Sequence, residues 1–421
     1  MDSVEQISPQ EWMVEPSAIK IMEILQSGEI EQKFALFVGG CVRDSLAKKP
    51  VNDLDIATLH KPDEVIKLLK EAGLKVFLSG IEHGTVSTII DNRSYEITSL
   101  RVDVKTDGRR ARVSHTEDWT EDAKRRDFTI NAIFADASGA IYDPVGGLKD
   151  LRDGKVRFIG RAQKRIEEDV LRLLRFFRFH SEFSSLPPDR EALEACRKMA
   201  GSLRYLSAER VRDELLKLFI ADSASQAMLL MFDNGILNQI LPEAIEIKRL
   251  FSMVNVEKIV NDCDPLRRMA SCIVTDGPGA EAISERFRLS NSDKLRLSKI
   301  FNQKPKLNIN TSKKKVLETL YRCGPSFCKD VVLLEWAQYS SLFSTDEKEV
   351  QDQWKQLYNL VDAWERPSLP VAGSDCVALG IPEGPFLGNV LNQLESWWVS
   401  RGFNDGREAC LKKLNDLVNI E

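Results

Sequence analysis

A change of hydrophobic pattern near residue 148 constrains the fold of this 421-residue chain more than any other feature. Before it, short β-forming runs (FALFVGG, LDIAT, STII, SYEITSL, AIFAD and AIYD) alternate with helical stretches such as DEVIKLLKEAG. After it, apolar residues recur every three or four positions, as in EEDVLRLLRFFRFH, SAERVRDELLKLFI, SQAMLLMFDNGILNQIL and VLETLYRCG. The pattern predicts an α+β domain followed by an almost wholly helical remainder.

Two polar stretches interrupt the helical part. NQKPKLNINTSKKK (302–315) predicts a loop, and ERPSLPVAGSD (365–375) separates a C-terminal helical piece from the rest. The chain is long enough for two to four domains, and it contains no repeat of fixed period. We therefore expect an assembly of several domains.

Composition excludes several classes of protein. No apolar run is long enough to cross a bilayer, and no charged-then-apolar leader follows Met1, so we expect a cytoplasmic protein without a membrane partner. The eight cysteines are scattered, and the closest pair, Cys323 and Cys328, has no histidine nearby. The four histidines do not cluster either. This spacing is unlike a disulfide framework or a zinc site, and it disfavours chemistry based on histidine.

Charge is distributed unevenly along the chain. The net charge is −5, which argues against a protein that coats long nucleic acids. Between Val145 and His180, however, ten Lys and Arg residues stand against five acids. A basic segment within an acidic chain predicts a restricted site for a polyanion.

The stretch FVGGCVRDSLAKKPVNDLD (37–55) combines the elements of a phosphate site. FALFV predicts a strand, Gly39 and Gly40 allow a tight turn and close approach of the backbone, and VRDSLA begins a helix whose free N–H groups suit an anion. By itself a glycine pair before a helix is more often an ordinary turn.

The two aspartates that follow strengthen the interpretation. Asp53 and Asp55 flank Leu54, so on a strand their carboxylates point to the same face. Two like charges so placed are unfavourable unless a cation lies between them. Carboxylate oxygens beside a phosphate site suit Mg²⁺, which needs no histidine. A solvated loop end is the plain alternative.

Taken together, these and later motifs resemble those of a known family. GGCVRD with the downstream DLD, RRDFTINA (125–132), DPVGGLKDL (143–151) and EEDVLRLLRFFRF (167–179) are similar, in order, to the motifs of the class II tRNA nucleotidyltransferases, the CCA-adding enzymes. AGSDCVALGIPEGPFLGNVL resembles the tail of bacterial members. The resemblance implies a polymerase β-like head (25–147), followed by an all-helical neck (148–220), body (221–365) and tail (366–421).

The resemblance also assigns roles to residues of the head. Gly40 and Arg43 match positions that hold the nucleotide triphosphate, and Asp53 and Asp55 match the catalytic Mg²⁺ ligands. In RRDFTINA, Arg126 matches a nucleotide contact and Asp127 is placed to reach the ribose, and a surface charge is an alternative left open for Arg125. Glu96 in SYEITSLR lies on a strand that could bring a third carboxylate near the pair, and this point stays open.

The EEDVLRLLRFFRF segment carries the remaining nucleotide-binding residues. Spacing alone predicts one amphipathic helix with salt-bridged charges. The family instead uses the Asp and the first Arg of this motif to read the Watson–Crick edge of the incoming base. Asp169 would accept from the amino group of C or A, and Arg172 would donate to the adjacent ring nitrogen. The residues assigned to the nucleotide site here are Glu168, Asp169, Arg172, Arg175 and Arg178.

The implied function is addition of C, C and A to tRNA 3′ ends from CTP and ATP. The 3′-OH would attack the α-phosphate in line, with metal ions stabilising the attacking and leaving oxygens as pyrophosphate departs. A CC-only or A-only enzyme, or a bacterial poly(A) polymerase, are the alternatives, and a scaffold with an inactive head is disfavoured by Asp53 and Asp55. The sequence leaves open the tRNA preference, the tRNA path across the C-terminal helices, and whether the protein is a monomer or a homodimer.

The stretch LRVDVKTDGRRARVSHTEDW (100–119) bears on the choice between C and A. It is rich in charge and has little apolar periodicity, which predicts a mobile surface loop, with an ordered hairpin edge as the alternative. In the family a loop here resembles a lever that reshapes the pocket for ATP. Arg109, Arg110 and Arg112 would then pair with acids of the neck, and the loop predicts full CCA addition.

Overall fold

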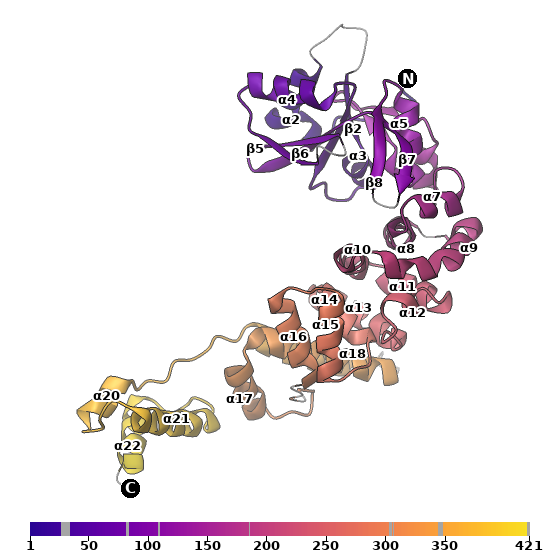
Figure 1. Ribbon diagram of the computed structural model, residues 1–421. Helices are drawn as coiled ribbons and strands as arrows, with labels where there is room; N and C mark the ends of the chain where they lie inside the picture. Colours follow the sequence, from indigo (N-terminus) through magenta and orange to yellow (C-terminus); the bar gives the residue numbers. More distant parts are fainter. Residues whose placement is uncertain are drawn as a thin grey trace. The chain divides into compact units, whose positions relative to one another are not determined.

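A computed structural model describes residues 1–26, 34–80, 84–107, 110–184, 186–302, 305, 307–343 and 348–418; the side chains of 79–80 and 103–113 lie outside this description. The chain divides into two compact units, residues 1–242 and 243–421. The first unit holds the strands, and the second is helical (Figure 1). The predicted α+β head with a helical remainder is confirmed.

An eight-stranded sheet forms the centre of the first unit, in the order β1-β10-β9-β2-β3-β6-β5-β4. β3 and β6 are parallel, and the other neighbouring strands are antiparallel. The strands of this sheet are β1 (Glu5–Gln6), β2 (Ala35–Val38), β3 (Leu54–Thr58), β4 (Val76–Gly80), β5 (Thr85–Ile90), β6 (Arg93–Ser99), β9 (Phe134–Ala135) and β10 (Ala140–Tyr142).

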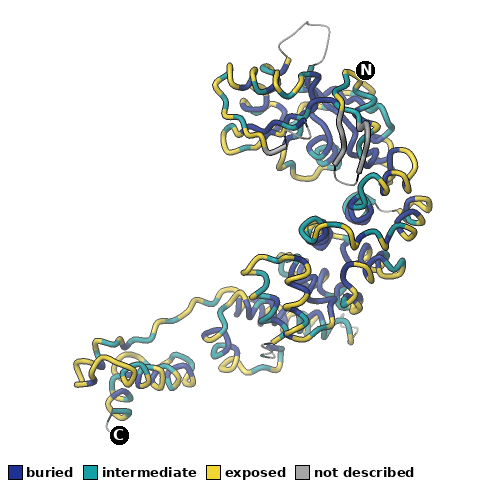
Figure 2. Tube along the Cα trace, viewed as in Figure 1, coloured by how far each residue is buried: buried dark blue, intermediate teal, exposed yellow. Residues whose placement is uncertain are grey.

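Both faces of the sheet are covered, and its central strand β2 is apolar throughout. Every residue of β2 is buried (Figure 2). Because successive side chains of a strand point to opposite faces, Phe37 packs in one core with helices α1, α2 and α4, and Leu36 and Val38 pack in a second core with α5. β1 and α2 precede residue 25, where the head was expected to begin, and both belong to this sheet or its core.

Helices surround the sheet and then continue to the end of the first unit. Among the described residues these are α1 (Glu11–Val14), α2 (Pro16–Leu25), α3 (Gly40–Leu46), α4 (Pro62–Glu71), α5 (Trp119–Arg125), α6 (Gly147–Arg152), α7 (Ala162–Glu168), α8 (Leu171–Phe183), α9 (Arg190–Met199), α10 (Ala208–Ile220), α11 (Ala224–Asp233) and α12 (Leu237–Ile240), with 3₁₀ turns η2 (Thr129–Asn131) and η3 (Ala200–Tyr205). α8 packs against both α10 and α11.

The prediction of one continuous helix through EEDVLRLLRFFRF is wrong. The chain leaves α7 after Glu168, and Asp169 adopts an extended conformation (φ −152°, ψ 107°) before α8 begins at Leu171. The Asp169 carboxylate accepts a hydrogen bond from the Leu171 amide (3.1 Å), so its side chain satisfies a backbone donor that a continuous helix would have satisfied.

Within the stretch 100–119, residues 101–107 and 110–115 form two antiparallel strands and not an irregular loop. β7 (Arg101–Asp107) pairs with β8 (Arg110–His115), and the two form a separate sheet. In both strands charged residues alternate with Val, Ala or other short residues, so the sequence shows no run of large apolar residues that would have predicted a strand. Arg109 lies outside the described residues, as do the side chains of Arg110 and Arg112.

The described part of the second unit contains ten helices. They are α13 (Ile247–Val260), α14 (Pro265–Cys272), α15 (Gly277–Arg286), α16 (Asn291–Asn302), α17 (Lys313–Cys323), α18 (Pro325–Leu342), α19 (Lys348–Asp362), α20 (Gly373–Ala378), α21 (Pro385–Ser400) and α22 (Arg407–Val418). The predicted break at 365–375 is confirmed as the connection from α19 to α20, and most of the predicted loop at 302–315 separates α16 from α17.

Two packing facts bear on the expected division into neck, body and tail. The boundary between the compact units falls at 242/243, within the expected body (221–365), since α11 packs against the neck helix α8. The core of the C-terminal helices includes Tyr321 of α17.

Within the described residues, no helix has the length and apolar character needed to cross a bilayer.

Candidate active site

A cavity of about 440 Å³ in the first unit gathers most of the residues that the motifs singled out. Its lining residues are Gly39, Gly40, Arg43, Asp55, Arg125, Arg126, Asp127, Asn131, Asp169, Leu171, Arg172, Arg175, Arg178, Phe179 and Arg210. Seven arginines therefore face three aspartates, an excess of four positive charges among the lining residues. Such a surface is suited to a polyphosphate.

The glycine turn forms one wall of this cavity. Gly39 has a positive φ of 73°, a conformation that side-chain-bearing residues rarely adopt, and α3 begins directly after it. At Gly40, a Cβ atom would lie 4.0 Å from Oδ2 of Asp55. A side chain at Gly40 would thus take up space beside the carboxylate.

Asp55 lies at the end of the site nearest the sheet, with other acids around it. In the parallel pairing of β3 with β6 it lies opposite Glu96. Burial and then Glu96 raise the pKa of Asp55, Arg126 opposes them and Asp53 adds to the rise, so that the pKa lies at about 6. Asp53 precedes β3, is exposed and does not line the cavity. Accumulated negative charge and oxygen-only donors fit a divalent cation, which would offset the repulsion.

Arg43 connects the glycine turn to α8. Its guanidinium lies over the rings of Phe179 (4.9 Å) and Phe183 (4.6 Å) of α8, and Nη1 donates to Oδ1 of Asn131. Nε also donates to Asp44 (2.9 Å). Stacking and hydrogen bonds together hold this cation at the cavity wall.

Asp127 is buried, and both of its oxygens are occupied. Asn131 Nδ2 donates to Oδ1 (3.0 Å), and Arg175 Nε donates to Oδ2 (2.6 Å). Burial alone would raise the pKa of Asp127, but Arg175 and Asn131 outweigh it and hold this pKa well below its ordinary value. Asp127 therefore fixes Arg175 at the cavity as well as lining it.

A second buried carboxylate, Asp122 of α5, positions two arginines. Arg125 Nε donates to its Oδ1 (2.7 Å) and Arg126 Nη2 to its Oδ2 (3.0 Å). Its Oδ1 also accepts from the backbone amide of Arg101 at the start of β7 (3.3 Å). Arg125 lines the cavity and its side chain is only 14% exposed, which disfavours the alternative of a surface charge.

The turn between α7 and α8 supplies Asp169 and Arg172 to the cavity. Arg172 Nη1 donates to Glu168 (2.7 Å) and to the carbonyl of Arg165 (3.0 Å). Asp169 Oδ2 accepts from Nη2 of Arg210 on α10 (2.7 Å). Each side chain is thus held by its own partner.

Further along α8, Arg175 and Arg178 share Glu214 of α10. Arg178 Nε donates to Oε2 of Glu214 (2.7 Å), and Arg175 Nη1 lies 3.5 Å from Oε1. Arg178 Nη1 also donates to Glu182 (3.1 Å). α10 therefore sets the positions of several cavity arginines although it lies far along the sequence.

Nine residues of the predicted site line the cavity together: Gly40, Arg43, Asp55, Arg126, Asp127, Asp169, Arg172, Arg175 and Arg178. Asp53 and Glu168 do not line it, although Glu168 holds Arg172. Sequence reasoning missed Asn131, Phe179 and Arg210, and the supporting acids Asp122 and Glu214. Asn131 belongs to RRDFTINA and could have been found there, whereas Arg210 and Glu214 carry no local signal.

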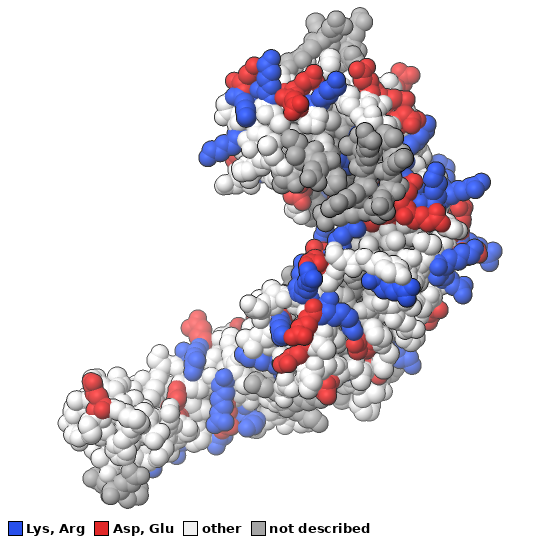
Figure 3. Space-filling view, in the orientation of Figure 1, with Lys and Arg blue, Asp and Glu red and all other residues white. Residues whose placement is uncertain are grey.

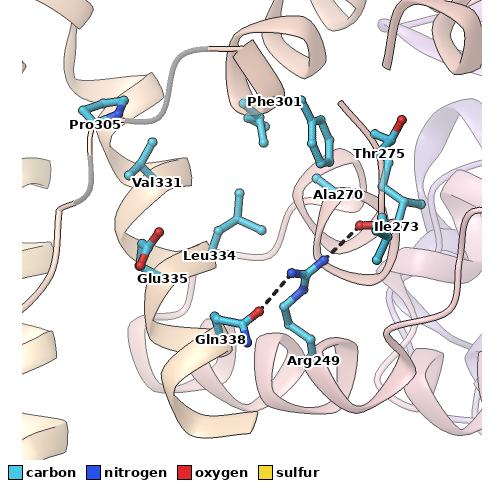
Figure 4. Close-up of a pocket in the computed structure, with 12 residues that line it drawn as sticks. Arg249, Ala270, Ile273, Thr275, Phe301, Pro305, Val331, Leu334, Glu335 and Gln338 are labelled. Carbon is cyan, nitrogen blue, oxygen red and sulfur yellow. Dashed lines mark hydrogen bonds between the residues drawn. The ribbon is translucent and has the colours of Figure 1, made fainter. Parts of the chain in front are cut away.

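A smaller cavity of about 350 Å³ lies in the second unit, between α13, α14, α16 and α18 (Figure 4). Arg249 enters it but donates to the carbonyls of Ser271 and Ile273 and to Oε1 of Gln338. Its remaining lining is mainly aliphatic and aromatic. The charged residues that the motifs single out line the cavity of the first unit instead.

The surface charge agrees with a local site. On the face shown in Figure 3, Lys and Arg side chains are interspersed with Asp and Glu and form no continuous basic band. The concentration of arginines in the cavity is thus a property of the site and not of this whole face.

Two family models and several relatives match this chain. A family model described as Poly A polymerase head domain matches residues 35–157, and one described as probable RNA and SrmB-binding site of polymerase A matches residues 186–248. The chain is 31% identical to the mitochondrial CCA tRNA nucleotidyltransferase 1 of Danio rerio, covering 94% of this chain and 90% of the relative. It is 32% identical to the CCA-adding enzyme of Levilactobacillus brevis, over 93% of this chain and 96% of that relative.

The fold has a counterpart among solved structures. The Bacillus stearothermophilus CCA-adding enzyme in complex with CTP matches with a TM-score of 0.74 at 25% identity, covering 97% of this chain and 99% of that one. Similarity to the relatives extends over nearly the whole of both sequences, so it includes the cavity and the helical remainder. On these grounds the chain belongs to the CCA-adding enzymes, the CCA tRNA nucleotidyltransferases.

Proposed function

We propose that this protein adds C, C and A to the 3′ end of tRNA without a nucleic-acid template, using CTP and ATP and releasing pyrophosphate. One observation carries the proposal: a single cavity combines seven arginines, the Asp55 carboxylate beside a glycine turn, and the Asp169 and Arg172 side chains. These are the groups needed to bind a triphosphate, to hold a cation at it and to select a base.

In this proposal the arginines bind the triphosphate. Arg43 is fixed by Asn131 and the two phenylalanine rings, and Arg126 is fixed by Asp122. Side chains held in this way lose little conformational freedom when they bind, and bidentate guanidinium–phosphate pairs are strong. Asp127, with Arg175 bound to it, would face the ribose.

Asp169 and Arg172 would read the base. The carboxylate accepts from the amino group of cytosine or adenine, and the guanidinium donates to the neighbouring ring nitrogen. Uracil and guanine place a carbonyl oxygen against the carboxylate and an N–H against the guanidinium. They are rejected because these polar groups would be left unpaired in a partly enclosed site.

Asp53 and Asp55 would hold Mg²⁺. Among the described residues no group of three or more potential metal ligands is assembled, so these carboxylates would share the ion with substrate oxygens and water. The bound ion would neutralise charge on the reacting phosphates. Asp55, with its pKa raised to about 6, gains most from such a cation.

Incorporation assays on three substrates test the proposal. Labelled CTP or ATP is supplied with tRNAs that end at the discriminator base, at C or at CC. We expect two additions of C to the first and one addition of A to the last. Arrest at CC, or A addition alone, would indicate a partial activity, and long A tracts would indicate a poly(A) polymerase. The net charge of −5 already disfavours the latter, because a grip on long RNA calls for a basic surface.

We propose a head, neck, body and tail as the functional divisions, with the helical parts holding tRNA by its backbone and shape. The cytoplasm is the proposed compartment, although relatives include mitochondrial enzymes.

A further inference from the structure

The Asp169 carboxylate is bound at both of its oxygens. Oδ1 accepts from the backbone amide of Leu171 (3.1 Å), and Oδ2 accepts from Nη2 of Arg210 (2.7 Å). The first partner is part of the same turn, but Arg210 comes from α10, 41 positions along the chain. The side chains of Asp169 and Arg210 are 24% and 22% exposed, so this pair is partly withdrawn from water while it still lines the cavity.

Asp169 needs such a partner because of its place in the chain. It lies outside α7 and α8, in extended backbone, and the helices do not fix its side chain. With only the Leu171 contact at Oδ1, the carboxylate could rotate about its Cβ–Cγ bond, since this terminal torsion has broad minima. The contact of Arg210 with the second oxygen removes that freedom.

Arg172 is positioned independently. Its Nη1 donates to Glu168 and to the carbonyl of Arg165, and Arg165 itself binds Glu168 and the carbonyls of Arg125 and Arg126. The acceptor and the donor proposed to read the base are therefore held from different sides. Loss of Arg210 would disturb the acceptor alone.

We propose that Arg210 is a positioning residue for base selection, which fixes the plane of the Asp169 carboxylate against the edge of the incoming base. The inference rests on the proposed function, because it gives Asp169 the role of acceptor. Discrimination by hydrogen bonding depends on the angle as well as the distance of the acceptor. A rotating carboxylate would bind cytosine and adenine less well and would reject uracil and guanine less strictly.

The test compares Arg210→Met and Arg210→Lys with the unaltered full-length protein. Initial rates are measured with each of the four nucleoside triphosphates on tRNA ending at C or CC. For Arg210→Met we expect the ratio of kcat/KM for CTP over UTP to fall about tenfold to a hundredfold. Arg210→Lys, which keeps a charged donor, should recover part of this ratio. Inhibition by pyrophosphate, which reports on the triphosphate contacts, should stay within about twofold.

Two controls separate positioning from a general structural role. Arg212→Met alters another arginine of α10, one that binds the adjacent Asp213 and does not line the cavity, and it should leave the ratio unchanged. In an Asp169→Ala background, Arg210→Met should produce no further loss of selection, because its effect runs through that carboxylate. Thermal unfolding confirms that each variant is folded.

Several outcomes would overturn the inference. If Arg210→Met slowed all four nucleotides equally, Arg210 would be merely structural, and if it weakened pyrophosphate binding, Arg210 would be a phosphate contact. A further loss of selection in the Asp169→Ala background would also refute it. Failure of the proposed function is distinguishable, because the unaltered protein would then not extend tRNA with CTP or ATP.

Discussion

Two arginine-rich networks, one in each unit, show how the same side chains can form a site or a support. In the second unit, Arg267 donates to Glu257 (2.8 Å), Asp262 (2.9 Å) and Asp330 (3.4 Å), and Arg268 donates to Glu257 (2.5 Å). Arg296 adds a two-point contact to Asp330 and one to Asp264. Three arginines meet four acids there, and the side chains of Arg267, Glu257 and Asp330 are at most 2% exposed.

The network of the first unit is arranged differently. Its acids, such as Asp122, Asp127 and Glu214, bind some of the arginines, and seven arginines still line a cavity. In the second unit the acids are at least as many as the arginines, so the charges of that network are neutralised. At the cavity of the first unit the arginines outnumber the acids, so that network can bind an anion. The number of arginines is therefore less informative than the groups that face them.

The largest expected effect is in the network of the first unit. Asp55→Asn should reduce incorporation of both CTP and ATP at least ten-thousandfold, about 5.5 kcal/mol of transition-state stabilisation, because a cation ligand is removed. Labelled-nucleotide incorporation measures this, and tRNA binding should be largely retained. Equal loss of binding and activity would mean that Asp55 serves folding instead.

The same variant has a stability signature whose sign follows from the pKa. Burial and Glu96 raise the pKa of Asp55 to about 6. Ionised Asp55 therefore costs folding free energy, a cost absent below an unfolded pKa of about 3.9 and fully present above about 6. Urea unfolding without metal should show the free energy of unfolding of Asp55→Asn rising relative to that of the unaltered protein between about pH 4 and pH 6, with little further change above pH 6.

Breaking the network of the second unit should affect stability. Arg267→Met should lower the free energy of unfolding by about 3–5 kcal/mol, because buried acids lose a partner. Denaturant unfolding measures the change. Arg286→Met, which breaks an exposed pair with Glu243, should cost only about 0–1 kcal/mol. Similar losses in the two variants would remove the contrast between buried and surface pairs.

Deletion of the hairpin tip tests whether the cavity must change its shape before A is added. Deletion of Thr106 to Arg112 removes the tip of β7 and β8, while Asp122 and its two arginines remain. We expect two C residues to be added normally and A addition to fall at least a hundredfold, about 2.7 kcal/mol. Gel analysis of the extended tRNA resolves each step. Completion of CCA at the normal rate would show that this hairpin has no role in A addition.

The smallest expected effect concerns selection. Asp169→Ala or Arg172→Ala should each lower discrimination against UTP and GTP by about 1–3 kcal/mol, since each loses half of a two-point readout. Competition between labelled CTP and UTP measures the ratio. Variants that are slow but still fully selective would contradict a protein template at this site.

The sequence by itself determined the parts whose signal is local. Alternating and continuous apolar runs predicted β2, β3, β5 and β6, because a two-residue period depends only on which face is buried. The motifs predicted that Gly40, Arg43 and Asp55 belong to one site, since the strand, the turn and the helix are neighbours along the chain. The change to a three- and four-residue period correctly marked the helical remainder.

Only the tertiary structure decided which charges share a partner. Arg175 binds Asp127, 48 positions away, and Arg210 binds Asp169, 41 positions away, across elements that packing brings together. The break at Asp169 was equally invisible, because helical periodicity continues on both sides of it, and the hydrogen bond from the Leu171 amide to the Asp169 carboxylate has no signal in that periodicity. A pattern of charges predicts that ion pairs will form, but charge attraction alone does not distinguish one acid from another. The packing of α8 against α10 determines which residues become partners.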